Sequence, residues 1–267
     1  MNLTKEISDL TPDEPANLSR DPYRNFNPRA YIFEYYSEIG DENNFLLEFY
    51  HRVFKNLPYG LAILELGGGP TVYQLFSASK KATEIVFSDY LPCNLREVAS
   101  WLAKDRNAFS WQRFSEKVAL LEFDGAVGAA KKAGEIEERT RSVIKKIVAC
   151  NALNKSVIPY TGLNTFDVVS SGFCLECISR DEQAFRLALS NALKCVKHKG
   201  TIILTMLKNS SNYMIGDKMF PSFPVDAEYI KKALENENFQ IQEIQETPAQ
   251  HNQGYEGLIA LSAVRIK

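Results

Sequence analysis

Several features that would direct a protein to a membrane, to nucleic acid or to an oxidising compartment are absent from this sequence. No apolar run approaches the roughly 20 residues of a membrane-spanning helix, and the N-terminal stretch MNLTKEISDLTPDEP has no apolar core of the kind found in signal peptides. The net charge of −2 gives no general attraction to nucleic acid or acidic lipid. Cysteine is scarce and odd in number, five in 267 residues, which favours free thiols. We expect a soluble, cytoplasmic monomer without a nucleic-acid or membrane partner.

The cysteines also give little support to a metal site. Cys174 and Cys177 form a C-x-x-C pair, which is compatible with redox chemistry or with half of a zinc site. The other three, Cys93, Cys150 and Cys195, form no second pair with the spacing of metal ligands. We therefore expect no metal.

A glycine-rich turn between an expected strand and an expected helix lies at residues 61–72, LAILELGGGPTV. The run Leu61–Leu64 does not alternate, as in a strand buried on both faces, and Glu65 after it is followed by Gly67 and Gly69. Glycine allows positive φ angles and lets a ligand approach the backbone closely. An acid at a strand tip followed by G-x-G is typical of methyltransferases that bind S-adenosylmethionine (SAM); a turn without a ligand is the alternative.

Two competing glycine motifs are incomplete. The dinucleotide fingerprint G-x-G-x-x-G, counted from Gly67, requires a third glycine where Val72 stands. No G-K-[ST] sequence follows the turn, so it is not a phosphate-binding loop of that type. These differences favour SAM as the cofactor.

A second acid marks the end of the next expected strand, residues 84–88. Asp89 lies 24 positions beyond Glu65, close to the spacing of the acid that binds the adenosine ribose hydroxyls. A carboxylate can accept hydrogen bonds from both hydroxyls. Tyr90 and Asn94 follow, where the adenine would be covered and hydrogen-bonded. The alternative is an ordinary solvated acid at a strand end.

Length and periodicity predict a single α/β domain with a doubly wound sheet. Residues 1–58 are expected to form an arm and a helical cap, and residues 59–267 the core. Alternating charges predict an exposed insertion helix at about 125–146, and residues 209–220 are expected to form an irregular polar loop. The remaining strands are expected at 146–150, 166–171, 200–207, 239–245 and 257–264.

The cap begins with a helix that carries three tyrosines. Asn27 is a suitable N-cap and Pro28 a suitable first residue, which places Tyr31, Tyr35 and Tyr36 on one face. Such a face is either a lid over the cofactor or ordinary packing.

The expected fourth strand, residues 166–171, runs into the sequence GFCLECI. Ligands of a doubly wound sheet lie beyond the C-terminal ends of its strands, which places Phe173, Cys174 and Glu176 at the reacting centre. A carboxylate there can accept a proton from an amine or stabilise the ammonium formed. The alternative for Glu176 is a cap on the helix that follows.

The chain resembles the small-amine methyltransferase family that contains the phenylethanolamine, nicotinamide and indolethylamine N-methyltransferases. The resemblance extends from about residue 26 to residue 265 and is carried by FNPRAYIFEYY, ELGGGPTVYQL, SDYLPCNL, SGFCLEC, YMIG and the terminal EGL. It implies a Rossmann-like class I methyltransferase fold, with a seven-stranded, mostly parallel sheet, helices on both faces and an N-terminal helical cap.

The resemblance also implies the roles of individual residues. Glu176 would be the catalytic carboxylate that faces the substrate amine. Asn151 stands where the nicotinamide enzyme has an acid, and no acid stands near Ser210, where a second substrate-facing acid is expected. The cofactor residues are Tyr31, Tyr36, Glu65, Gly67, Gly69, Thr71, Tyr73, Asp89, Tyr90, Asn94, Asn151 and Ala152, and the substrate residues are Tyr35, Phe173, Cys174, Glu176, Ser210 and Tyr213.

The function expected from these observations is SAM-dependent N-methylation of a small primary or secondary amine by direct in-line transfer, with S-adenosylhomocysteine as the second product. Methylation of a pyridine nitrogen or of a thioether is an alternative, and neither of these would need a proton acceptor. A SAM-binding protein without turnover is an alternative of another class.

Overall fold

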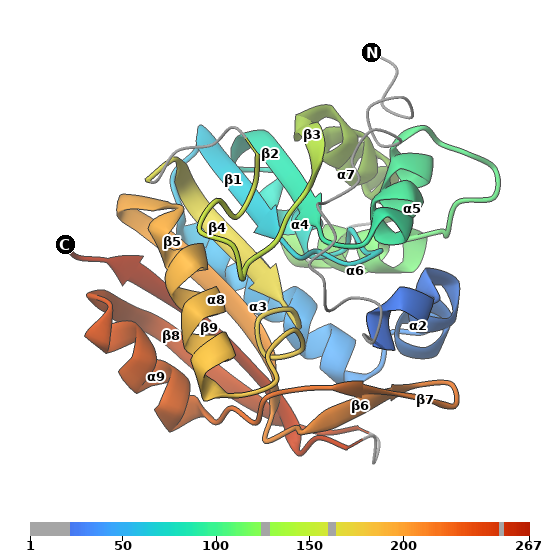
Figure 1. The fold of residues 1–267 in the computed structure, drawn as a ribbon. Coiled ribbons are helices and arrows are strands. Elements are labelled where there is room, and N and C mark those ends of the chain that lie inside the picture. The colour runs from blue at the N-terminus through green and yellow to red at the C-terminus, as the bar shows by residue number, and fades with distance from the viewer. Residues whose placement is uncertain (1–21, 124–128, 160–163, 251–253) are drawn as a thin grey trace.

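The computed structural model describes residues 22–123, 129–159, 164–250 and 254–267, and its centre is a seven-stranded sheet (Figure 1). The strand order is β3-β2-β1-β4-β5-β9-β8, and every neighbouring pair is parallel except the two that include β9. The expected fold class is confirmed. The strands are β1 (Leu61–Leu66), β2 (Ala82–Asp89), β3 (Ile144–Ala149), β4 (Phe166–Gly172), β5 (Val196–Lys208), β8 (Phe239–Pro248) and β9 (Gly257–Arg265).

Helices cover both faces of this sheet. Consecutive β1 residues alternate between the two layers, so Ile63 packs in one hydrophobic cluster and Leu64 in the other. The first cluster includes α2 to α7 and the second α8 and α9. The helices are η2 (Pro22–Asn25), α2 (Pro28–Tyr36), α3 (Asp41–Asn56), α4 (Leu75–Ala78), α5 (Pro92–Leu102), α6 (Gln112–Glu122), α7 (Ala129–Val143), α8 (Glu182–Lys194) and α9 (Ala227–Asn236).

Two sequence-based expectations outside the sheet are wrong. Residues 209–220 are not an irregular loop, because they contain the hairpin β6 (Asn212–Ile215) and β7 (Lys218–Pro221). The strands are short, and Gly216, with a φ of 60°, forms the two-residue turn with Asp217.

The helix predicted as an exposed insertion is α7, and one of its faces is buried. Ala133, Ile136 and Thr140 follow one another at helical spacing and are at most 1% exposed. This face packs on α6, and the helix also contacts β2 and β3. The sequence did not predict this buried face, because it is short and most of the other residues of the helix are charged.

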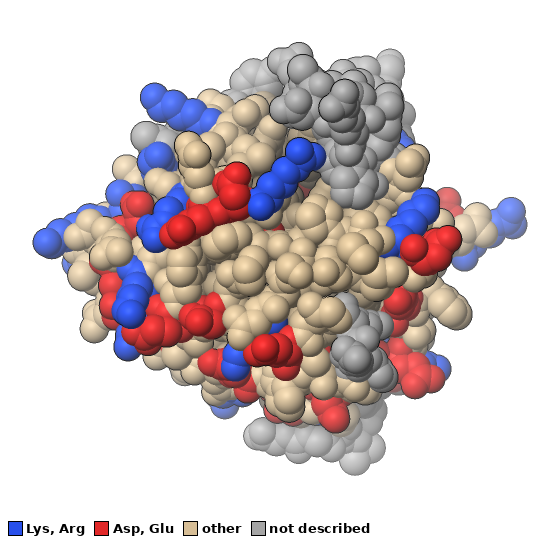
Figure 2. All heavy atoms as spheres, turned by 60° about the horizontal axis from the view of Figure 1, so that its bottom comes forward, with Lys and Arg blue, Asp and Glu red and all other residues tan. Residues whose placement is uncertain are grey.

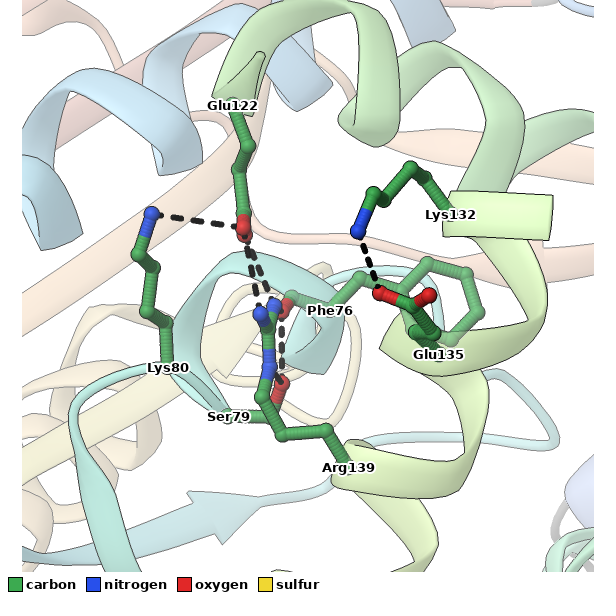
Figure 3. A network of polar contacts seen from close by, with 7 residues as sticks. All are labelled: Phe76, Ser79, Lys80, Glu122, Lys132, Glu135 and Arg139. Carbon is green, nitrogen blue, oxygen red and sulfur yellow. Dashed lines mark hydrogen bonds and ion pairs between the residues drawn. The ribbon is translucent and has the colours of Figure 1, made fainter. Parts of the chain in front are cut away.

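A polar network ties α7 to the helices beside it (Figure 3). Arg139 donates two hydrogen bonds to the Glu122 carboxylate, at 2.7 and 3.1 Å, and others to the Ser79 hydroxyl and the Phe76 carbonyl. Lys80 lies 3.4 Å from the same carboxylate. The Glu122 side chain is only 1% exposed, so these partners replace the water that would otherwise solvate its carboxylate.

The surface carries charges of both signs. On the face shown in Figure 2, acidic and basic side chains are interspersed around a band without charged side chains. Within the described ranges, no helix is both long and apolar enough to cross a membrane.

Candidate active site

A cavity of about 430 Å³ lies at the C-terminal ends of the strands, where the strand order reverses between β1 and β4. Its wall includes residues of α2 and α3, the glycine turn after β1, the ends of β2 to β5 and the segment before β9. The side of β2 and β3 is the half expected to hold the cofactor. The side of β4, β5 and β9 is the other half, which we call the acceptor half.

The glycine turn has the backbone that only glycine adopts without strain. Gly67 and Gly69 have φ angles of 66° and 63°. A Cβ atom on Gly67 would lie 2.1 Å from the sulfur of Cys174, so the close approach of the two segments needs a glycine. A Cβ atom on Gly69 would meet nothing within 4 Å, which leaves this part of the backbone open to the cavity.

Asp89 at the end of β2 organises the same turn. One carboxylate oxygen accepts from the Gly69 backbone N–H at 2.9 Å, and the other accepts from Leu91 N–H at 2.8 Å and from the Asn94 amide at 3.0 Å. Burial raises the pKa of Asp89, and the hydrogen bonds to the carboxylate oppose that shift. Asp89 and Asn94 both line the cavity, as does Tyr90.

Glu65 at the end of β1 is fully buried beneath the turn. Gln74 donates a 3.1 Å hydrogen bond to Oε1, while Oε2 has no hydrogen-bond partner among the described residues. Burial raises the pKa of Glu65 to about 8. The Thr71 hydroxyl donates to the Gly68 carbonyl at 2.9 Å and holds the turn closed. An unpartnered buried oxygen at a cavity wall is suited to a ligand that brings a donor.

Tyrosines from the cap and the core meet over the turn. The hydroxyls of Tyr31 and Tyr36 lie 3.3 Å apart, and the rings of Tyr36 and Tyr73 are 5.1 Å apart. Tyr35 donates its hydroxyl hydrogen to the Met214 carbonyl in β6. Burial raises the pKa of each of these phenols, so all remain neutral at physiological pH. The predicted N-cap is also present, since Asn27 accepts from two backbone N–H groups of α2.

The remaining predicted residues of the cofactor half follow β3. Asn151 accepts a 3.0 Å hydrogen bond from the Leu153 backbone N–H and lines the cavity together with Ala152. The Asn151 amide nitrogen donates no hydrogen bond to another described residue, which leaves this donor for a ligand.

In the acceptor half, aromatic rings and thiols line the wall. Phe173, Cys174 and Tyr213 are all at the cavity, as predicted, and Phe173 has a φ of 52°. The Tyr213 hydroxyl lies 3.2 Å from that of Tyr23, which donates to the Cys177 carbonyl. Burial raises the pKa of the Cys174 and Cys177 thiols, so they are protonated. All five cysteines are free, and the part of the chain that is described contains no group of three potential metal ligands.

Two predicted substrate residues do not line the cavity. Glu176 is fully buried, its Oε1 accepts from the Leu207 backbone N–H at 3.0 Å, and Oε2 has no hydrogen-bond partner among the described residues. Burial raises its pKa to about 7. Ser210 is also buried and donates to the Asn212 carbonyl at 2.7 Å. The structure thus places both behind the wall, and the Glu176 carboxylate contacts β5 through Leu207 N–H.

The sequence reasoning missed several cavity residues. Gln74 lies within the glycine motif ELGGGPTVYQL and could have been found there. Tyr50 lies in α3 and reaches the Thr205 hydroxyl at 3.3 Å, while Glu42 and Tyr255 come from segments far apart in the chain. No local pattern marks these three, because tertiary folding alone brings them to the site.

The cofactor half fits SAM in three respects. The backbone is open at Gly69, the Glu65 Oε2 atom lacks a hydrogen donor among the described residues, and the Asp89 carboxylate lines the cavity. Neutral tyrosine rings, as at Tyr31 and Tyr73, suit a positively charged sulfonium.

The relatives of the chain agree with this geometry. The sequence profile of the NNMT/PNMT/TEMT family matches residues 15–265. The chain belongs to this family. It is 31% identical to human nicotinamide N-methyltransferase over 238 residues, covering 86% of this chain and 88% of that protein. It is also 28% identical to rat phenylethanolamine N-methyltransferase, covering 83% and 80%, and 27% identical to rabbit indolethylamine N-methyltransferase, covering 86% and 88%.

Solved structures show the same fold at low sequence identity. Magnesium protoporphyrin IX methyltransferase from Synechocystis, with bound SAM, has a TM-score of 0.59 and 13% identity, covering 96% of this chain and all of that chain. A Burkholderia thailandensis N-methyltransferase for 1,6-didemethyltoxoflavin has a TM-score of 0.52 and 13% identity, covering 97% and 94%. The family resemblance seen in the sequence is confirmed, and the protein is a SAM-dependent small-molecule N-methyltransferase.

Proposed function

We propose that this protein transfers the methyl group of SAM to the nitrogen of a small primary or secondary amine. The observation that carries the proposal is a single cavity that joins the glycine turn and Asp89 to a half lined by aromatic rings. The relatives named for nicotinamide, phenylethanolamine and indolethylamine support a small nitrogen compound as acceptor.

The cofactor is proposed to lie along the β1 and β2 ends. Asp89 accepts the ribose hydroxyls, Asn151 donates to the adenine edge, and the donor groups of the amino-acid part satisfy Glu65. When bound, SAM supplies an electrophilic methyl group on a positively charged sulfur. The residues that complete this binding set are Tyr31, Tyr36, Gly67, Gly69, Thr71, Tyr73, Tyr90, Asn94 and Ala152.

The acceptor half is proposed to align the nitrogen and to exclude water. Tyr35, Phe173 and Tyr213 form rigid aromatic walls, and alignment of the reacting atoms is the main source of acceleration in such a transfer. Neutral rings also stabilise positive charge as it develops on nitrogen. Cys174 and Ser210 complete the proposed set, Ser210 by fixing the chain beneath the wall.

Glu176 is proposed to accept the amine proton through water, because its carboxylate lies behind the cavity wall. Its unpartnered Oε2 and a pKa of about 7 suit a proton acceptor near neutral pH. The hydrogen bond from Leu207 N–H fixes the other oxygen, and Leu207 itself lines the cavity.

Several further expectations belong to this proposal. We expect a cytoplasmic monomer that needs no metal, to which free cysteines lend support. Methylation of a pyridine nitrogen or thioether is the alternative reaction, and SAM binding without turnover is the alternative of another class. Light scattering tests the monomer, and activity after treatment with a chelator tests the metal.

The test of the function is a screen of alkylamines, pyridines and thioethers with SAM, read as S-adenosylhomocysteine formed and as methylated product by mass spectrometry. We expect product from alkylamines. Turnover with pyridines or thioethers alone would replace the proposal by the alternative reaction, and SAM binding without any product would favour the non-catalytic protein.

A further inference from the structure

Glu42 places a further carboxylate on the cavity wall, besides those of Glu65, Asp89 and Asp181. It lies in the first turn of α3, is half-buried and lines the cavity. Among the described residues, no Lys, Arg or His side chain forms an ion pair with Glu42. The carboxylate therefore contributes negative charge to a wall made largely of aromatic rings.

The Glu42 carboxylate is held by two donors from the segment before β9. Oε1 accepts from the Gln250 backbone N–H at 2.9 Å, and Oε2 accepts from the Tyr255 hydroxyl at 3.0 Å. Burial raises the pKa of Tyr255, and Glu42 beside it adds to the shift, so the phenol keeps the hydrogen that it donates. Each carboxylate oxygen has two lone pairs, and so each can accept one more hydrogen bond.

This carboxylate belongs to the acceptor half of the cavity. Tyr255 lies just before β9, where Leu258 pairs with Leu207 of β5, and both leucines line the cavity. Asp89, which faces the cofactor, lies at the end of β2 on the other side of β1. Glu42 is thus placed for the second substrate and not for the ribose.

We propose that Glu42, positioned by Tyr255, binds the positively charged group of the acceptor, so that the substrate is an amine protonated at neutral pH or one that carries a second cationic group. This inference rests on the proposed function and narrows it to a substrate class. A neutral pyridine or thioether gains little from the carboxylate of Glu42, whereas an ammonium group gains a charge-assisted hydrogen bond. The ring of Tyr35, whose pKa the nearby Glu42 helps to raise, adds an attractive surface for the same cation.

The role of Glu42 differs from that proposed for Glu176 and has a different kinetic signature. A contact made equally with substrate and transition state changes KM and leaves kcat nearly unchanged. Glu42→Gln keeps the shape and acceptor oxygen but removes the charge, so the KM for the amine should rise about tenfold or more. Tyr255→Phe keeps the ring and removes the donor, and we expect a smaller rise in KM.

The experiment compares Glu42→Gln, Tyr255→Phe and the matched control Glu48→Gln with the parent, using the alkylamine that the screen identifies. Glu48 lies on the same helix but pairs with Lys117 outside the cavity. We expect a raised amine KM in the first two variants, with SAM affinity by calorimetry and melting temperature unchanged, and no effect of the control.

The outcomes separate this inference from the proposed function. Parent turnover of an amine with the same KM in Glu42→Gln overturns the role of Glu42 and leaves N-methylation standing. An equal loss in the control, or a loss of SAM affinity, also overturns it. A parent that methylates only neutral acceptors, or nothing, overturns the proposed function and the inference together.

Discussion

At the scale of single residues, Asp89 is the acid that we propose connects the cofactor to the glycine turn. Its carboxylate accepts hydrogen bonds from Gly69, Leu91 and Asn94, which fixes its orientation toward the cavity. We predict that Asp89→Ala weakens SAM binding more than tenfold, because a buried charge-assisted hydrogen bond contributes roughly 1.5 to 3 kcal/mol. Calorimetric titration with SAM measures the change.

The matched control is Glu84→Ala, an acid at the exposed start of the same strand. It should bind SAM as the parent does. Equal SAM affinity in Asp89→Ala and the parent would remove Asp89 from the cofactor site and leave it with a purely structural role in the turn.

Glu176 permits a clean separation of chemistry from structure. Glutamine retains the oxygen that accepts from Leu207 N–H but removes the charge. We predict that Glu176→Gln lowers kcat by roughly ten- to a thousandfold, about 1.4 to 4 kcal/mol, with SAM affinity and melting temperature near the parent values. A higher pH should restore part of the loss, since more of the amine arrives neutral. Full activity would show that Glu176 serves the fold alone.

At the scale of elements, α2 is the part of the cap best placed to respond to ligands. Tyr31, Tyr35 and Tyr36 line the cavity, and the helix is also fixed from outside by the Arg29–Glu97 ion pair at 2.8 Å. We predict that SAM slows hydrogen exchange at the backbone amides of α2, because ligand contacts oppose local opening. Mass spectrometry of peptides from α2 measures this, with α9 as the unaffected comparison. Identical exchange in both states would make α2 ordinary packing.

The contact between α6 and α7 depends on the network around Glu122. Removing Arg139 leaves a buried carboxylate with Lys80 as its remaining cation among the described residues. We predict that Arg139→Ala lowers the free energy of unfolding by about 3 kcal/mol, the lower end of the range for breaking a buried pair. Arg186→Ala is the control, because its pair with Glu182 is exposed and its loss should cost much less than the loss of Arg139. Urea denaturation compares them, and equal losses would contradict the prediction.

The sequence predicted elements well where a local rule applies. The apolar run of β1 and the Asn27 cap of α2 each depend on a few adjacent residues. Prediction from the sequence failed for elements whose burial depends on residues far away in the chain. The β6–β7 hairpin is short, and it is fixed by contacts with α2, such as that of Tyr35 with Met214. At the positions of α7 whose burial is described, the buried side chains are the small or medium ones of Ala133, Ile136 and Thr140, set among many charges.

At the scale of the whole molecule, the seven-stranded, mostly parallel sheet and the position of the cavity followed from the glycine motifs and the family resemblance, but the wall of the acceptor half did not. Glu42 and Tyr255 are 213 positions apart, and their hydrogen bond exists only because α3 and the segment before β9 meet at the cavity. The sequence also did not show that Glu176, which is near Phe173 in the chain, lies behind the cavity wall and accepts a hydrogen bond from Leu207 N–H of β5.

Buried acids should also make the stability of the ligand-free protein depend on pH. Burial raises the pKa of Glu65 to about 8 and that of Glu176 to about 7, from a usual value of 4.5. Between pH 4.5 and these raised pKa values, the folded protein keeps two protons that the unfolded chain has lost. The contribution of the two acids to the free energy of unfolding is therefore complete below pH 4.5 and is lost as the pH rises through 7 and 8. His51, whose pKa burial lowers, acts in the opposite direction, so variants are needed to isolate the acids.

We predict that the double variant Glu65→Gln, Glu176→Gln flattens the fall in unfolding free energy between pH 5 and pH 8, by an amount on the order of 5 kcal/mol. The amide side chains keep their size and have no proton to lose, so folded and unfolded chains no longer differ at these positions. Urea denaturation at several pH values without ligand measures the slope. Glu228→Gln, at an exposed position on α9, should leave the slope unchanged. A parental slope in the double variant would mean that both acids are ionised in the folded protein, and Glu176 would then lack the pKa near 7 that suits it to accept a proton from the amine.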